Sequence, residues 1–148
     1  GGRPILLPCN ECFRPDLEAL AQAINSKTKA IIINSPNNPS GVVYEEKVLQ
    51  DIAKILNRSE QDIYVLADEV YRDILYTDLP FPSMLSIFSN AILIYSWSKS
   101  YALPGERIGY LCFSPQLSDY EELIQAVRFY NRCLGFVNSP AVWQHILS

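Results

Sequence analysis

Three short, uninterrupted runs of apolar residues constrain the fold of this chain more than any other feature. They are Ala30–Ile33, Ile63–Ala67 and Ala91–Tyr95, and none of them alternates between apolar and polar residues. Strands with this pattern are buried on both faces, which is typical of a parallel sheet covered by helices. A weaker run, Ile5–Leu7, predicts a further strand near the N-terminus.

Helical periodicity fills the intervals between these runs. Three segments each place their apolar residues on one helical face: Leu17, Leu20, Ala21 and Ile24; Val48, Leu49, Ile52 and Leu56; and Leu123, Ala126, Val127 and Tyr130. Ser139 and Pro140 have the types of an N-cap and a first helical residue, and predict a last helix after them. Strands that alternate with helices indicate an α/β protein, with an open, mostly parallel sheet and helices on both faces.

A fourth strand, Ile108–Phe113, is expected to reverse the parallel order. Only twelve residues, 96–107, separate it from the run that ends at Tyr95, and the pair Pro104-Gly105 interrupts them. A parallel crossover needs a dozen residues or more and usually contains a helix. The strand is therefore predicted to run antiparallel, so that it begins at the sheet edge where the parallel strands end.

Composition narrows the class of protein. The 148 residues carry a formal net charge of −4 without a basic stripe, so nucleic acid is not an expected partner. The absence of an apolar run of about 18 residues predicts no membrane span. Residues 1–4 do not lead into the apolar stretch of a signal peptide, which favours a soluble, cytoplasmic protein.

Cys9 and Cys12 form a CxxC pair without a second pair or histidines at zinc spacing, so reduced thiols rather than a metal site are expected.

Polar side chains suited to catalysis follow the apolar runs where the strands are expected to end. The first run leads into Asn34–Gly41, the second into Asp68–Tyr71 and the third into Ser96–Lys99, while Arg107 directly precedes the fourth strand. Ligands of open α/β sheets bind outside the carboxyl ends of the strands. One edge is therefore predicted to gather an amide, a carboxylate, a phenol, an amine and a guanidinium. The chain has no GxGxxG loop, which argues against a dinucleotide site.

Three motifs in these segments resemble those of the class I and II aminotransferases, which use pyridoxal 5'-phosphate on an aspartate aminotransferase-like fold. Residues 96–109 (SWSKSYALPGERIG) resemble the family's cofactor-attachment motif. Asn38-Pro39-Ser40-Gly41 resembles its Asn-Pro-x-Gly turn, and Asp68–Tyr71 resembles its Asp-x-x-Tyr strand end. The motifs occur in the family's order over residues 30–113. Trp97 is a departure, because a smaller residue is usual there.

The resemblance implies a role for each matching residue near the reacting atoms. Lys99 is the amine that forms a Schiff base with the cofactor aldehyde and then carries a proton between substrate and cofactor. Asp68 pairs with the pyridine nitrogen and keeps it protonated, which makes the ring an electron sink. Tyr71 and Asn38 hydrogen-bond the cofactor's phenolic oxygen.

The resemblance also implies that Arg107 and Ser96 bind the cofactor phosphate. A guanidinium matches a phosphate bidentately, and the Ser96 hydroxyl adds a further contact. Ser98 is the weaker candidate, because neighbouring residues of an extended chain face opposite sides. For the same reason Glu69 is expected to point away from the cofactor. His145, the sole histidine, is left without a role.

Family members are longer, so residues 1–148 are expected to form part of the large domain, without its N-terminal strands and the C-terminal small domain. The parent would transfer an amino group between an amino acid and a 2-oxo acid, and the segment alone would be impaired. A homodimer or a self-associating fragment is expected. Two alternatives stay open: another reaction on the same fold, such as carbon–sulfur β-elimination or decarboxylation, and a non-catalytic aminotransferase-like module.

Overall fold

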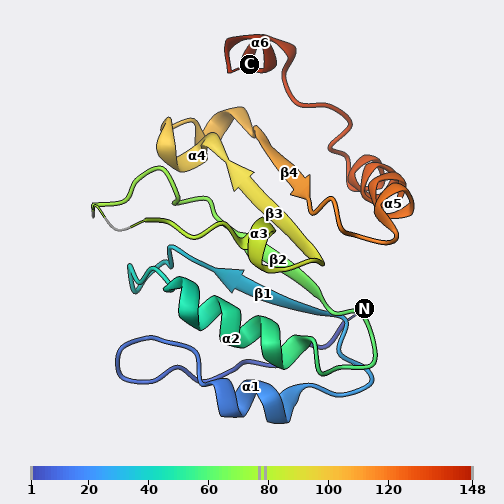
Figure 1. Cartoon of the computed structure of the whole chain (residues 1–148). Coiled ribbons are helices and arrows are strands. Elements are labelled where there is room, and N and C mark those ends of the chain that lie inside the picture. Colours follow the sequence, from blue (N-terminus) through green and yellow to red (C-terminus); the bar gives the residue numbers. More distant parts are fainter. Residues whose placement is uncertain (1, 77, 79, 148) are drawn as a thin grey trace.

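The predicted strands form one sheet in the computed structural model, which describes residues 2–76, 78 and 80–147 (Figure 1). β1 (Ala30–Asn34), β2 (Tyr64–Asp68) and β3 (Ala91–Ser96) are parallel neighbours in that order. β4 (Gly109–Phe113) pairs antiparallel with β3. The expected α/β fold, with a mostly parallel sheet and one antiparallel strand, is therefore confirmed.

The link between β3 and β4 explains the reversal. It contains only α4 (Trp97–Ser100) and the 3-10 helix η1 (Pro104–Glu106), which are too short to carry the chain back along the sheet. β4 therefore starts beside the end of β3, where Ser96 pairs with Gly109. A Cβ atom at Gly109 would collide with the Tyr95 carbonyl oxygen, so glycine permits this close return.

The longer helices form where apolar periodicity predicts them. They are α1 (Leu17–Ala23), α2 (Glu46–Leu56) and α5 (Tyr120–Cys133). α6 (Ala141–Ile146) is also present, but its N-cap is Pro140 rather than Ser139. α3 (Met84–Ile87) is a single turn, which is too short to show a helical repeat in the sequence.

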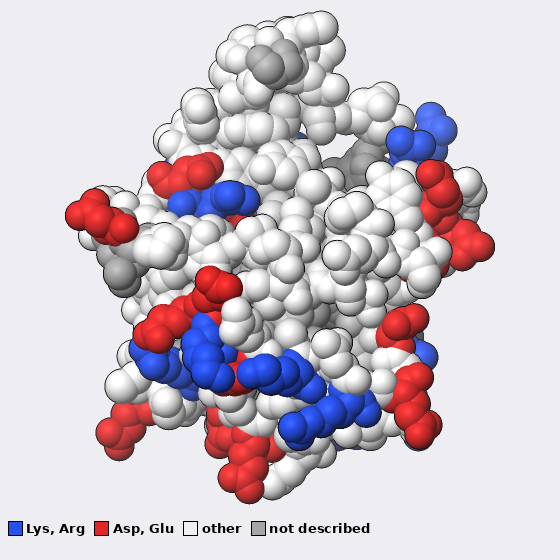
Figure 2. Space-filling view, viewed as in Figure 1, with Lys and Arg blue, Asp and Glu red and all other residues white. Residues whose placement is uncertain are grey.

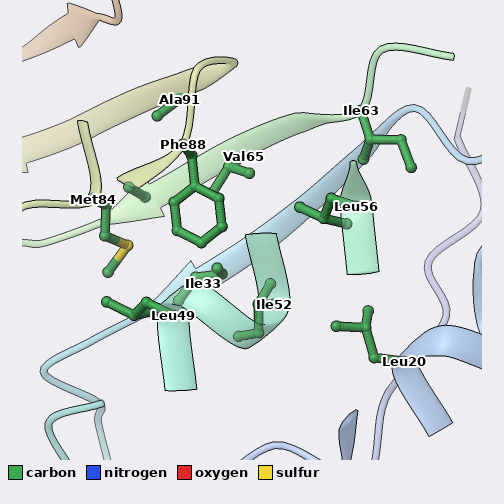
Figure 3. Packing of buried hydrophobic residues seen from close by; sticks show 11 residues of the cluster. Leu20, Ile33, Leu49, Ile52, Leu56, Ile63, Val65, Met84, Phe88 and Ala91 are labelled. Carbon is green, nitrogen blue, oxygen red and sulfur yellow. The ribbon is translucent and has the colours of Figure 1, made fainter. Parts of the chain in front are cut away.

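The hydrophobic core lies between α2, α3 and one face of the sheet (Figure 3). Leu49, Ile52 and Leu56 form the inner stripe of α2 and are at most 7% exposed. They pack in one cluster with strand residues and with the segment around α3: Ile33, Val65, Ala67, Met84, Phe88 and Ala91. Burying each large side chain contributes about 1.5–3 kcal/mol, so this stripe fixes α2 against the strands.

Two predictions about strands differ from the structure. In β1, Ile33 is buried at 4% exposure, but Ile32 is 70% exposed, so the two faces of this strand are not equally covered. The run Ile5–Leu7 does not form a strand, and Leu6 is 92% exposed. Pro4 and Pro8 bound that run and lack the backbone N–H that a ladder needs, which explains the failure.

The C-terminal helices α5 and α6 lie apart from the core (Figure 1). Neither contains a buried residue; Phe129 in α5 is 62% exposed, and Leu134, the C-cap residue of α5, is 74% exposed. Several contacts tether this part. The Tyr64 hydroxyl donates to Asp119 at the start of α5, the Tyr120 ring meets Phe113 of β4 edge-on with centroids 6.0 Å apart, and the Trp143 indole donates to Glu106 in η1.

On the face seen in Figure 2, acidic and basic side chains are interspersed over the region of α1 and α2, and neither sign forms a broad patch. Among the described residues, no helix has the length and apolar character needed to cross a membrane.

The core assignment predicts unequal effects for two isoleucine truncations. Ile52→Ala leaves a cavity under α2, where Ile52 is 2% exposed, and is expected to lower the free energy of unfolding by about 2–5 kcal/mol. Ile32→Ala, at a position 70% exposed, is expected to cost about 1 kcal/mol or less. Urea unfolding of both variants measures the difference, and equal losses would contradict this core.

The exposed apolar side chains Leu6 and Ile32 predict self-association of the chain. Exposed apolar patches and open strand edges favour pairing between copies. Light scattering should show a mass above that of the 16.8 kDa monomer, and the double variant Leu6→Lys, Ile32→Lys should lower it. A monomeric mass for the unaltered chain at high concentration would contradict the expectation.

Candidate active site

Asp68 ends β2 at the centre of the predicted site edge. In the sheet register it lies between Asn34 of β1 and Ile94 of β3. The Asn34 side-chain amide donates to the Asp68 carbonyl oxygen at 3.1 Å. The Asp68 Oδ1 atom is buried and has no hydrogen-bond partner among the described residues. A buried acceptor without a hydrogen bond destabilises the folded state by about 1–3 kcal/mol or more. A ligand that donates a hydrogen bond to Asp68 Oδ1 would remove this penalty.

Asn38 and Tyr71 come together over the ends of β1 and β2. Asn38 Nδ2 donates to the Tyr71 hydroxyl at 3.0 Å. The Asn38 backbone N–H donates to Asn34 Oδ1 at 3.1 Å, so the asparagine that bonds the Asp68 carbonyl also holds this turn. The Asn34 side chain thereby links the turn that carries Asn38 to the strand end that carries Asp68 and Tyr71.

Lys99 reaches the same group from α4. The helix begins at the end of β3, and the Ser96 hydroxyl caps it by accepting from the Ser98 backbone N–H at 3.1 Å. Lys99 Nζ lies 5.7 Å from the centroid of the Tyr71 ring, within the range of a cation–π contact. The structure therefore brings together Lys99, Tyr71 and Asn38, as the sequence predicts.

Ser96 and Ser98 form a hydroxyl pair that the sequence did not predict. Their Oγ atoms are 2.7 Å apart, and Ser96 Oγ is 3.3 Å from the Ile108 carbonyl oxygen. The prediction that Ser98 faces away from Ser96 is wrong, because the chain is helical from Trp97 onward rather than extended. The signal in the sequence is the spacing of the two serines: Ser96 ends the strand, and Ser98 follows two residues later, directly before Lys99.

Arg107 lies at the start of β4, next to the carbonyl that Ser96 approaches. Its backbone has φ 51° and ψ 45°, in the left-handed region that non-glycine residues rarely adopt. The guanidinium donates to the Pro104 carbonyl oxygen at 2.7 Å and is exposed. Within the described part of the chain, Arg107 makes no ion pair, and its side-chain hydrogen bond is to Pro104 rather than to Lys99 or Asp68.

Glu69 follows Asp68 and is fully buried, at 0% exposure. Its Oε2 accepts from Arg72 Nη1 at 3.0 Å, while Oε1 has no hydrogen-bond partner among the described residues. Burial raises the pKa of Glu69 to about 7, although Arg72 and a hydrogen bond from the Met84 backbone lower it. Because Met84 belongs to the core, Glu69 points toward the core, as strand alternation predicts.

Together these features define an α/β protein with a candidate ligand site at the carboxyl edge of its sheet. An amine, a phenol and an amide meet there, and the Oδ1 atom of Asp68 at the end of β2 is buried without a partner among the described residues. The sequence model of aminotransferase class I and II matches residues 1–148. The chain belongs to this family.

Named relatives agree with the family. The aspartate aminotransferase of Thermotoga maritima is 38% identical over 117 residues, which cover 77% of this chain and 30% of that protein. The probable aspartate/prephenate aminotransferase of Thermus aquaticus is 39% identical over 114 residues, which cover 76% of this chain and 29% of that protein. The crystal structure of an amino transferase from Eubacterium rectale has a TM-score of 0.89 and 40% identity, and the match covers 93% of this chain and 36% of that one. The chain thus spans about 30% of the length of these curated relatives.

The buried Glu69 predicts a pH dependence of folding stability. Its pKa is about 7 in the folded chain against an ordinary value of 4.5, so the folded state holds a proton that the unfolded state has lost between these pH values. The contribution of Glu69 to the free energy of unfolding is therefore fully present below pH 4.5 and falls as the pH rises to about 7. Relative to the unaltered chain, Glu69→Gln should become more stable as the pH is raised through that window.

Urea unfolding at pH 4.5, 6 and 8 measures this change, with Glu60→Gln as the control at a surface glutamate. A stability difference between Glu69→Gln and the unaltered chain that stays constant over the window would contradict the assignment.

Proposed function

We propose that this chain is the cofactor-binding part of an enzyme that transfers an amino group between an amino acid and a 2-oxo acid with pyridoxal 5'-phosphate. The observation that carries the proposal is the buried Asp68 Oδ1 without a donor, at the same sheet edge as Lys99 and Tyr71. Membership of the class I and II aminotransferase family supports the reaction class. The chain, which spans about 30% of the length of its curated relatives, would correspond to the central part of the large domain.

The residues present fit pyridoxal 5'-phosphate. When bound, this cofactor supplies an aldehyde that an amine can attack and a protonated ring that withdraws electrons from the substrate α carbon. Asp68 Oδ1 would accept the ring N–H, which satisfies the buried oxygen and holds that proton in place. A carboxylate in this position is stabilised by the same contact, so each charge favours the other.

Lys99, Tyr71 and Asn38 would act on the opposite side of the ring. Lys99 would hold the cofactor covalently and, once a substrate amine replaces it, move a proton to and from the substrate α carbon. The Tyr71 hydroxyl, held by Asn38 Nδ2 at 3.0 Å, would donate to the cofactor's phenolic oxygen. This fixed donor orients the ring relative to the Lys99 amine, which lies 5.7 Å from the Tyr71 ring centroid.

The phosphate would lie between α4 and the start of β4. Ser96 and Ser98 offer two hydroxyls there, and Arg107 offers an exposed guanidinium whose hydrogen bond to the Pro104 carbonyl leaves other N–H groups available. Further residues of a longer parent would complete the phosphate and substrate contacts. The parent is proposed to be a cytoplasmic homodimer that takes amino acid and 2-oxo acid substrates.

Covalent trapping tests this proposal. Pyridoxal 5'-phosphate reduced onto the chain with borohydride should modify Lys99, as located by peptide mass spectrometry. Lys99→Ala should lose the modification, while Lys54→Ala, on the surface of α2, should retain it. Asp68→Asn should weaken cofactor binding by roughly 10- to 100-fold, because a charge-assisted hydrogen bond contributes about 1.5–3 kcal/mol.

Equal total labelling of Lys99→Ala and of the unaltered chain, with the label confined to surface lysines in both, would contradict the assignment. The reaction type is tested on the longer parent by measuring the 2-oxo acid released from an amino acid with and without a 2-oxo acid acceptor. A transaminase requires the acceptor for turnover, whereas a lyase does not.

A further inference from the structure

A buried phenol connects the two segments that carry Tyr71 and Lys99. Tyr95 lies in β3 and is 5% exposed. Its hydroxyl donates to Asp73, in the segment that follows Tyr71, and lies 2.8 Å from Ser100 Oγ, at the end of α4. One side chain thus holds a loop from β2 and the helix from β3 by their neighbouring residues.

The direction of these hydrogen bonds follows from the number of protons that each group can donate. A carboxylate only accepts, so the single proton of the Tyr95 hydroxyl is donated to Asp73. The Ser100 hydroxyl must then donate to the Tyr95 oxygen. Burial and the contact with Asp73 raise the pKa of Tyr95, which keeps this proton in place. The chain of bonds therefore runs from Ser100 through Tyr95 to Asp73.

Further contacts hold Tyr95 and Asp73 in place. The Tyr95 ring stacks on Tyr110 with centroids 5.0 Å apart and meets Trp97 edge-on at 5.5 Å. Asp73 Oδ1 lies 3.8 Å from Arg72 Nε, and Arg72 is paired with the buried Glu69. The phenol therefore has a fixed ring, and its acceptor is linked to a carboxylate in the core.

α4 depends on such outside contacts because it has only four residues. Isolated helices of this length are unstable, so tertiary contacts set their orientation. Lys99 directly precedes Ser100, so a bond at Ser100 restrains the backbone from which the amine extends. Without that bond, α4 would lose one of its restraints relative to the segment that carries Tyr71.

We propose that Asp73, Tyr95 and Ser100 form a positioning network that fixes α4 against the segment after β2 and so holds the Lys99 amine over the Tyr71 ring. The inference rests on the proposed function in taking Lys99 as the attachment residue. None of the three residues needs to touch the cofactor. They act through the position of the lysine, which sets how often the amine reaches the cofactor aldehyde in a productive geometry.

The test compares Tyr95→Phe with Tyr110→Phe in the full chain. Both remove a hydroxyl from the same aromatic cluster, but within the described residues only the Tyr95 hydroxyl is hydrogen-bonded. Tyr95→Phe should slow attachment of pyridoxal 5'-phosphate to Lys99 by about tenfold while attachment to the surface Lys54 stays unchanged. Ser100→Ala should act in the same direction, and Tyr110→Phe should leave the ratio of Lys99 to Lys54 labelling unaltered.

Hydrogen–deuterium exchange without cofactor separates this inference from the proposed function. Tyr95→Phe and Ser100→Ala should speed amide exchange in residues 97–103, whereas Tyr110→Phe should not. Exchange at the unaltered rate in both network variants would overturn the positioning role, whatever the labelling shows. If exchange rises as expected but the unaltered chain does not label Lys99, the network stands and the proposed cofactor attachment fails. A merely structural role would lower the melting temperature without changing the labelling ratio, and that result also overturns the inference.

Discussion

The register of the parallel strands is the constraint on which the site depends. Asn34, Asp68 and Ile94 are level with one another across β1, β2 and β3, and this alignment brings the ends of the three strands to one edge. Side chains alternate between the faces of a strand, so a slip of β2 by one residue would put Glu69 or Ala67 in the place of Asp68 and turn the Asp68 side chain to the other face. The apolar residues that pack against α2 prevent such a slip, because Val65 and Ala67 would leave the core with it.

The two adjacent carboxylates show how one strand end serves both folding and function. Asp68 and Glu69 each have a buried oxygen without a hydrogen-bond partner among the described residues, and both oxygens carry a desolvation cost. Glu69 offsets part of its cost through Arg72, which in turn lies near Asp73 and the network that reaches α4. Asp68 makes no such pair within the described residues, and the proposed cofactor would supply the missing donor. Local costs of this kind are typical of functional sites.

Much of the fold could be predicted from the sequence because its signals are local. Continuous apolar runs identified β1, β2 and β3, and the short linker with Pro104 identified the antiparallel β4. The motifs placed Asn38, Tyr71 and Lys99 in one cluster because strand ends of a parallel sheet share an edge. The geometry around Arg107 and its relation to Lys99 could not be predicted, because a left-handed residue at the end of a 3-10 turn leaves no periodic pattern.

The parts that the sequence did not predict depend on single turns or on distant contacts. The sequence ranks Ser98 below Ser96 because it predicts an extended chain there, and the four-residue helix α4 is too short to recognise by periodicity. The sequence predicts Tyr95 only as a strand residue, because its hydrogen bond to Asp73 spans 22 positions and belongs to no motif.

A crystal structure with pyridoxal 5'-phosphate bound would test the central claim most directly. The account predicts the ring nitrogen about 3 Å from Asp68 Oδ1 and density continuous with Lys99 Nζ. A cofactor bound elsewhere, with Asp68 Oδ1 still lacking a donor, would contradict it.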